Sequence, residues 1–240
     1  MILGAMQPYF FPYLGYFDLI NRSDRWVVFD VVKYAPRSWM NRNRILHPTT
    51  GWQYVGVPVD RRTEGNRLDA VRVIDGQAAR RKMLGQIEHY RRGRAPHYEA
   101  VRGLIEDSFR GFDQGLLRDL NVAGLAATCA YLGIRFDPVI LSQSDIVLPP
   151  IDHAGQWALE ISTALGADHY VNPPNGRGLF DAAAFAARGI RLSFTDVADF
   201  RYACGRYDFV ERLSILDVLM WNTPQAVRGY LDDLNTAAPT

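Results

Sequence analysis

The chain has 240 residues, 48% of them hydrophobic, which is ample for the core of one α/β domain or of two small ones. Its 27 lysines and arginines against 26 aspartates and glutamates leave a formal net charge of +1, which argues against a nucleic-acid partner. No segment is apolar for long enough to cross a bilayer and none has the form of a secretory leader, so we expect a cytoplasmic protein without membrane insertion.

The first element in the chain is predicted to be a buried strand, because residues 1–6 are apolar or small. Pro8 and Pro12 follow, and each restricts the backbone and removes a hydrogen-bond donor. Residues 7–14 are therefore expected to form a rigid loop, with a short helix over residues 16–21 behind it. Strand, loop and helix in this order are typical of the opening of a βαβ unit.

A second strand is predicted over residues 26–29, and it ends at Asp30. Ligands of open α/β sheets bind outside the carboxyl ends of the strands, where polar loop residues are often functional. Gln7 and Tyr9 follow the first strand and Asp30 follows the second. We therefore predict that these three side chains face a ligand.

The polar loop over residues 33–43 concentrates hydrogen-bonding side chains around one tryptophan. Arginine presents a planar fork of donors and asparagine offers both a donor and an acceptor, so such a loop suits a sugar, a phosphate or a carboxylate. Its candidate ligand contacts are Tyr34, Arg37, Trp39, Asn41, Arg42 and Asn43.

Two later segments have the alternation of half-buried strands, residues 52–59 and residues 68–74. We expect them to pair as a hairpin beside or over the first motif, with Pro58 on an edge strand. In a single domain spanning residues 1–240, residues 44–76 are thus predicted to be a β-hairpin insertion or lid.

Residues 77–133 are predicted to be a helical segment, with helices over 77–92, 97–112 and 116–132. The basic residues of the first helix suit either a solvated face or a phosphate-bearing ligand. His89 lies at the end of that helix, where an imidazole can act as a base, and we name it with Asp30 as a candidate catalytic residue.

From residue 133 onward, the chain repeats helix, glycine and strand, which predicts a largely parallel sheet with crossover helices and Rossmann-like layering. The polar ends of these strands are expected to share the edge of Gln7 and Asp30. Near the end of the chain, Ser214 and Asp217 have the spacing of a capping box, which predicts the start of a helix.

Several motifs along the chain resemble those of the WbqC-like family. They are Gln7-Pro8 with Pro12 and Gly15-Tyr16-Phe17, Ser23-Asp24, Val28-Phe29-Asp30, Arg37-Ser38-Trp39, Asn41-Arg42-Asn43, Gly56-Val57-Pro58-Val59, His89-Tyr90, Gly166-Ala167-Asp168-His169-Tyr170 and the run from Leu213 to Leu219. This family is named for its occurrence in gene clusters for O-antigen and other surface glycans, and some members are associated with natural-product pathways. The resemblance implies a role in polysaccharide or natural-product biosynthesis.

The opening loop is also comparable to the His-x-Gly-His loop of nucleotidyltransferases, whose imidazoles stabilise phosphoryl charge. Here the sequence reads Tyr13-Leu14-Gly15-Tyr16, and tyrosine has no positive charge near neutral pH. The chain has no Walker loop, nucleophile elbow or dinucleotide fingerprint, and its five histidines have no recognisable metal spacing. We predict no metal site and no tightly bound cofactor, although an activated acyl donor or a nucleotide is compatible.

The leading hypothesis is a transferase that moves an acyl or aminoacyl group onto an amine or hydroxyl of an amino sugar or related metabolite. Asp30 or His89 would be the base. The expected substrate-binding residues are Gln7, Tyr9, Tyr16, Tyr34, Arg37, Trp39, Asn41, Arg42 and Asn43. Its partners would be small-molecule substrates, some of them carrier-bound. The alternatives are a nucleotide-dependent transferase that releases pyrophosphate and a non-catalytic binding or scaffold protein of a glycan-assembly pathway.

Overall fold

A computed structural model describes residues 1–60, 67–195 and 200–236 of the chain. Its centre is a five-stranded sheet in the order β7-β2-β1-β8-β9, and every neighbouring pair is parallel. The strands are β1 (Ile2–Met6), β2 (Arg25–Val28), β7 (Pro138–Ile140), β8 (His169–Asn172) and β9 (Arg191–Phe194). Along the chain these are the first, second, third, fourth and fifth sheet strands, so their spatial order is 3-2-1-4-5. The predicted α/β fold with a parallel sheet is confirmed.

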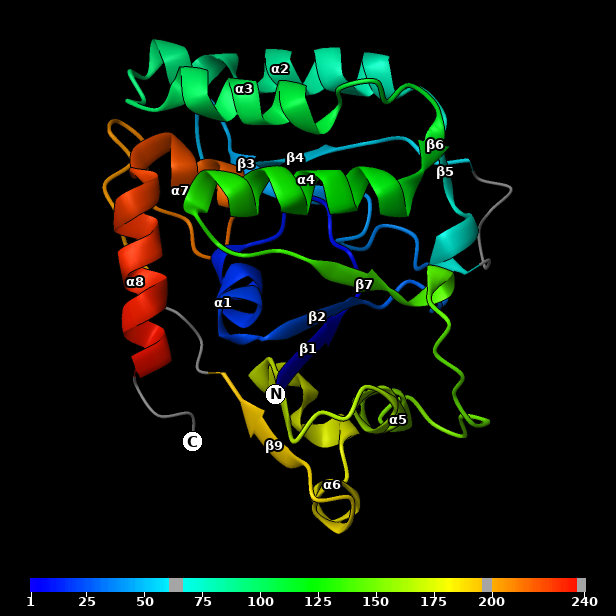
Figure 1. Cartoon of the computed structure of the whole chain (residues 1–240). Helices are drawn as coiled ribbons and strands as arrows, with labels where there is room; N and C mark the ends of the chain where they lie inside the picture. The colour runs from blue at the N-terminus through cyan, green and yellow to red at the C-terminus, as the bar shows by residue number, and fades with distance from the viewer. Residues whose placement is uncertain (61–66, 196–199, 237–240) are drawn as a thin grey trace.

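Helices cover both faces of this sheet, which is why its strands are buried on both sides. The helices are α1 (Leu14–Arg22), α2 (Gly76–Arg92), α3 (Tyr98–Ser108), α4 (Leu117–Leu132), α5 (Gln156–Ala164), α6 (Ala182–Ala187), α7 (Ile215–Trp221) and α8 (Pro224–Thr236). In Figure 1, α1, α4 and α8 lie on one side of the sheet, with α2 and α3 stacked beyond α4, whereas α5 and α6 lie on the other side.

The central strand β1 divides its side chains between these two layers. Leu3 and Ala5 point into the core formed with α5 and α6. Gly4 faces the other layer, where an added Cβ would lie 2.7 Å from the Trp26 ring. A small residue at this position therefore lets the large indole of Trp26 on β2 pack against the middle of the sheet.

The hairpin of the chain contains one of the two expected strands, since β4 (Trp52–Gly56) lies within residues 52–59, but its partner strand is different. The antiparallel pair is β3 (Arg42–Leu46) with β4, joined through Gly51, whose φ of +67° favours glycine. The predicted pairing of residues 52–59 with 68–74 was wrong: β5 (Arg72–Val73) pairs with β6 (Gly115–Leu116), and the two predicted segments meet only at a Val59–Val73 bridge. β3 was missed because its alternation is built from arginine and asparagine rather than from apolar residues.

The segment over residues 77–133 is mainly helical as expected and contains α2, α3, α4 and the short β6. Three 3₁₀ turns complete the described structure, over Leu68–Ala70, Leu141–Gln143 and Pro174–Leu179. Across the described part of the chain, no helix combines the length and the apolarity that a bilayer crossing needs.

Candidate functional site

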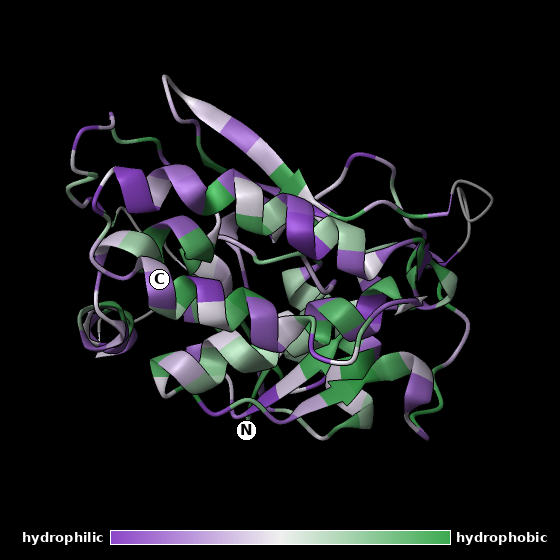
Figure 2. Cartoon of the chain, turned by 90° about the horizontal axis from the view of Figure 1, so that it is seen from above, coloured by the Kyte–Doolittle hydropathy of each residue, from purple (hydrophilic) through white to green (hydrophobic). Residues whose placement is uncertain are grey.

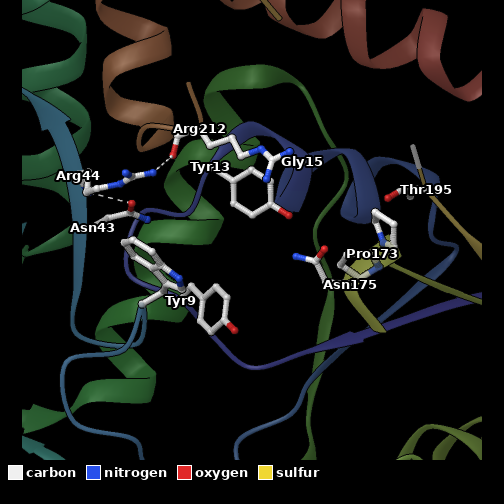
Figure 3. Close-up of a pocket in the computed structure, with 11 residues that line it drawn as sticks. Tyr9, Tyr13, Gly15, Asn43, Arg44, Pro173, Asn175, Thr195 and Arg212 are labelled. Atoms are coloured by element: carbon white, nitrogen blue, oxygen red, sulfur yellow. Dashed lines mark hydrogen bonds between the residues drawn. The ribbon is translucent and has the colours of Figure 1, made fainter. Parts of the chain in front are cut away.

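A cavity of about 250 Å³ lies at the carboxyl ends of β1 and β8, where the strand order reverses. This position is the usual ligand site of a doubly wound sheet. The cavity is lined by Tyr9, Tyr13, Gly15, Trp39, Asn43, Arg44, Pro173, Pro174, Asn175, Thr195 and Arg212. Figure 3 shows Asn43 and Arg44 on one side, Pro173, Asn175 and Thr195 on the other, and the two tyrosines between them.

A second cavity of about 470 Å³ adjoins the first and is mainly apolar. Phe29, Trp157, Tyr170 and Phe180 line it, and it extends over α5 and the 3₁₀ turn after β8. The residues common to both linings are Tyr9, Tyr13, Trp39, Pro173 and Asn175. The site thus has a polar compartment and an apolar compartment with a shared wall.

Two buried asparagines hold the loops that form this wall. The side chain of Asn43 donates to the carbonyls of Phe10 (3.1 Å) and Phe11 (2.9 Å). The side chain of Asn121 on α4 donates to the carbonyls of Pro8 (2.7 Å) and Met40 (2.8 Å). Because each amide joins the proline-rich loop to the 33–43 loop or its strand, the site is preorganised without a ligand.

Tyr13 stands at the amino end of α1, and its backbone forms an antiparallel bridge with Ser214. Its ring lies over Gly15, where an added Cβ would be only 2.5 Å from Tyr13 Cε2. Burial raises the pKa values of both Tyr9 and Tyr13, although the nearby Arg212 opposes the shift at Tyr13. Both phenols therefore stay protonated near neutral pH. The Tyr9 hydroxyl donates to Gln7 Oε1 at 3.3 Å, and the Tyr13 hydroxyl can donate a hydrogen bond to a ligand.

The charge of the polar compartment comes from Arg44 and Arg212. The Arg44 guanidinium donates to the Arg212 carbonyl at 3.4 Å, and its Cζ lies 5.5 Å from the centroid of the Trp39 ring. Arg212 adopts a left-handed backbone with φ of +53°. Within the described structure, neither cavity lining includes a carboxylate, an imidazole, a thiol or a lysine. The compartment is suited to a phosphate or a carboxylate.

The predicted substrate-binding residues fall into two groups. Gln7, Tyr9, Trp39 and Asn43 line one or both cavities. The others, which are Tyr16, Tyr34, Arg37, Asn41 and Arg42, line neither. Of these, Tyr16 is 1% exposed and its hydroxyl donates to the Gln7 carbonyl at 2.8 Å, which stabilises the loop from behind.

Asp30 lies at the carboxyl end of β2 as expected, but its side chain is fully buried and lines neither cavity. It accepts hydrogen bonds from Arg118 of α4 (3.1 Å) and from the backbone N–H and hydroxyl of Ser142 after β7. With its acceptors engaged in this way, the carboxylate joins α4 to two strands. In this geometry Asp30 has a structural role, and its carboxylate does not reach either cavity.

His89, the other candidate catalytic residue, lies in the last turns of α2 and also lines neither cavity. Its ring packs against Tyr90 and Tyr207, with centroids 4.2 Å and 5.5 Å away, and Nδ1 is 2.7 Å from the Gln86 carbonyl. Burial lowers its pKa, so the imidazole is neutral at pH 7. The structure does not bring His89 and Asp30 together.

The predicted capping box at the start of α7 is only half present. Ser214 accepts from the Leu216 N–H and also donates to the Phe11 carbonyl at 2.7 Å, so it caps the helix and holds the proline-rich loop. Asp217 is buried and accepts from the hydroxyls of Tyr90 and Tyr202 instead of capping. Burial raises the Asp217 pKa to about 6.

Sequence reasoning missed several lining residues, among them Tyr13, Arg44, Thr195 and Arg212, whereas Asn175 belongs to the polar end of β8 that was expected at this edge. Thr195 follows the parallel strand β9, so the rule that ligands bind at carboxyl ends would have found it as well. Arg44 would have followed from treating residues 42–46 as a strand, because it shares a face with Arg42. Nothing in the sequence connects Arg212 with the other lining residues.

The comparisons with known proteins agree with the resemblance seen in the motifs. A relative from Mycobacterium tuberculosis (strain ATCC 25618 / H37Rv), the uncharacterized protein Rv1507c, is 28% identical over 230 residues, which is 95% of this chain and 96% of the relative. No solved structure matches the chain. The profile of the WbqC-like protein family matches residues 7–229, which include both sides of the cavity, and the chain therefore belongs to the WbqC-like protein family.

Proposed function

We propose that the protein is a small-molecule transferase that moves an acyl or aminoacyl group from an activated donor to an amine or hydroxyl acceptor. The observation that carries this proposal is the pair of joined compartments, one cationic and one aromatic, with a shared wall at the sheet edge. Group transfer requires two partners held with their reacting atoms in contact, and two compartments with a shared wall meet that requirement.

In this proposal the donor's anionic group binds between Arg44 and Arg212. Tyr9, Tyr13 and Asn175 lie at the junction of the compartments, where the hydroxyl of Tyr13 and the amide of Asn175 donate to the transferring carbonyl oxygen. The acceptor nitrogen or oxygen forms a bond to the carbonyl carbon while the bond to the leaving group breaks. The proton lost by the acceptor leaves with the departing thiolate or phosphate.

The proposal depends on positioning and charge stabilisation rather than on a protein base. A mechanism without a protein base fits the two cavity linings, because the described residues there carry guanidinium, phenol, amide, hydroxyl and apolar groups. Asp30 and His89 are given no base role, because each is enclosed by protein groups away from both cavities. We place the reaction in surface-glycan or natural-product biosynthesis, with an amino sugar or related metabolite as acceptor, on the basis of the family context.

A nucleotide-dependent transferase is the second candidate, and one observation favours it. The cavity lies at the reversal point of a 3-2-1-4-5 parallel sheet, a common nucleotide site, and it has two arginines. Transfer of a phosphoryl or nucleotidyl group needs little covalent chemistry from the protein beyond positioning and charge stabilisation.

Thermal stability of the purified protein, measured with and without candidate ligands, tests the proposal, because a ligand that binds only the folded state raises the melting temperature. The panel contains acyl-coenzyme A thioesters, nucleotide-sugars, nucleoside triphosphates and free amino acids. Each stabilising donor is then incubated with amino-sugar acceptors. Release of a free thiol with an amide product supports acyl transfer, whereas release of pyrophosphate supports the second candidate.

The matched variants are Arg212→Asn in the cavity and Arg135→Gln at the opposite, amino end of the sheet. Both remove one positive charge, and Arg135 is exposed before β7. Stabilisation that is lost in the first variant and kept in the second locates the donor in the cavity. Equal stabilisation of all three proteins would contradict the proposed site.

A further inference from the structure

The outer face of the β3–β4 hairpin forms a strip of half-buried arginines and exposed aromatic rings that continues from the cavity. The register pairs Arg42 with Gly56, Arg44 with Tyr54 and Leu46 with Trp52, so the side chains of Arg42, Arg44, Tyr54 and Trp52 share one face with the buried Leu46. Trp52 and Tyr54 are 40% and 39% exposed, whereas Asn43, Ile45 and Val55 on the other face are buried. Figure 2 shows the hairpin reaching out past the helices.

The side chains of this strip are stacked on one another. The Arg42 guanidinium lies 3.9 Å from the centroid of the Tyr54 ring. The Arg44 guanidinium lies 5.1 Å from the Trp52 ring and also near Trp39, which lines both cavities. Both guanidinium groups are thus held beside aromatic rings rather than beside a carboxylate.

The electrostatic balance of this region is one-sided. Residues 31–59 contain one lysine and three arginines but no aspartate or glutamate, although the whole chain is nearly neutral. In the described structure, Arg42 and Arg44 form no ion pair; each donates one Nη2 bond to a backbone carbonyl, of Arg37 and Arg212 respectively. The Nε atoms of both are buried and have no hydrogen-bond partner.

An anion is the partner that these two arginines lack. Donors of a fixed, planar guanidinium match the oxygens of a phosphate in pairs, and a buried donor without an acceptor is costly. Arg42 and Arg44 are two residues apart on one face of a strand, about 7 Å along it. That separation suits two linked phosphate groups, one within reach of the cavity and the next farther along the hairpin.

We propose that the β3–β4 strip binds the diphosphate of a diphosphate-bridged metabolite. The first phosphate binds Arg44 at the mouth of the cavity, the second binds Arg42, and the base or sugar beyond it lies against the exposed rings of Trp52 and Tyr54. This inference rests on the proposed function, since it makes the donor's anionic group a diphosphate. Nucleotide-sugars and coenzyme A thioesters share this chemistry.

Titration calorimetry with inorganic orthophosphate and pyrophosphate separates the two arginines. We expect pyrophosphate to bind wild type more tightly than orthophosphate, and Arg42→Gln to lower pyrophosphate affinity about tenfold while orthophosphate affinity is unchanged. Arg44→Gln is expected to weaken both ligands, and Arg135→Gln neither.

The rings are tested with a nucleotide-sugar and with coenzyme A. Trp52→Ala and Tyr54→Ala are expected to weaken whichever of the two metabolites binds by a larger factor than they weaken pyrophosphate, because each ring contacts the base or sugar as well as an arginine. Quenching of tryptophan fluorescence in wild type, lost in Trp52→Ala, reports the same contact. The metabolite that binds more tightly than pyrophosphate identifies the source of the diphosphate.

The failures of the two proposals are distinguishable. If Arg42→Gln binds pyrophosphate as tightly as wild type while Arg44→Gln and Arg212→Asn lose it, the strip is not a phosphate site and the cavity proposal stands. If wild type binds none of the phosphate ligands, both proposals are overturned.

Discussion

The ring of Tyr13 occupies the space that a side chain at residue 15 would need: a Cβ on Gly15 would lie 2.5 Å from Tyr13 Cε2 and 3.2 Å from Cζ. Gly15 lies inside the first turn of α1, where glycine is normally unfavourable by about 0.5–1 kcal/mol relative to alanine. The glycine therefore positions the tyrosine at the cost of some helix stability.

We expect Gly15→Ala to displace the Tyr13 ring from the cavity wall, because the ring can rotate whereas the helix backbone cannot. Donor affinity should fall about tenfold, as in Tyr13→Ala, while the melting temperature stays the same or rises. Calorimetry and thermal unfolding give the two readouts. The matched control is Gly85→Ala on α2, where a Cβ meets nothing within 4 Å, so stability should rise and affinity should not change. Loss of stability without loss of affinity in Gly15→Ala would contradict this role.

Arg212 combines a positive charge in the cavity with a left-handed backbone, φ +53°. We expect Arg212→Asn to weaken anion binding about tenfold with little change in stability, because asparagine tolerates this backbone region and the Arg212 carbonyl can still accept from Arg44. Arg212→Val should also lower the free energy of unfolding by about 1–3 kcal/mol, since a β-branched residue is strained there. Denaturant titration compares the two variants, and equal stability would argue against strain at this position.

Asp30 and Arg118 form a buried ion pair, with side chains 0% and 4% exposed. Asp30→Asn is expected to lower the free energy of unfolding by about 3 kcal/mol, because it leaves the Arg118 charge buried with only the partly exposed Asp119 beside it. Adding Arg118→Met should recover much of the loss. Glu211→Gln, which removes an exposed ion pair with Arg201, should cost less than about 1 kcal/mol. An Asp30→Asn protein with full stability and no transferase turnover would instead support the base role first predicted.

The buried Asp217 should make stability depend on pH. Its pKa is about 6 in the fold against a usual 3.8, so between these values the folded state holds a proton that the unfolded state has lost. The contribution of this carboxyl to the free energy of unfolding therefore falls as pH rises from about 4 to 6, by about 3 kcal/mol, and stays low above that range. The difference between wild type and Asp217→Asn, measured by denaturation across this range, isolates the effect. A pH-independent difference would show that Asp217 is not protonated in this way.

Much of the architecture followed from local sequence. Runs of apolar residues between glycines predicted the parallel sheet, and the prolines of residues 7–14 predicted the rigid loop at the edge of the sheet. These features are local. A proline restricts the backbone at its own position, and the spacing of apolar residues along a segment favours helix or strand for that segment. Four predicted ligand contacts, Gln7, Tyr9, Trp39 and Asn43, also line the cavities, since each follows or flanks a strand end.

Only the tertiary structure decided what each polar residue does at that edge. Asp30 ends its strand as predicted, but Arg118 and Ser142, distant in sequence, enclose its carboxylate. Arg212 enters the cavity because Ser214 bridges to Tyr13 across nearly the whole length of the chain. The sequence by itself determined the strands of the parallel sheet and the rigid loop at one edge of it, because those depend on neighbours along the chain. Which side chains are free to meet a ligand depends on contacts between distant residues, and those exist only in the folded protein.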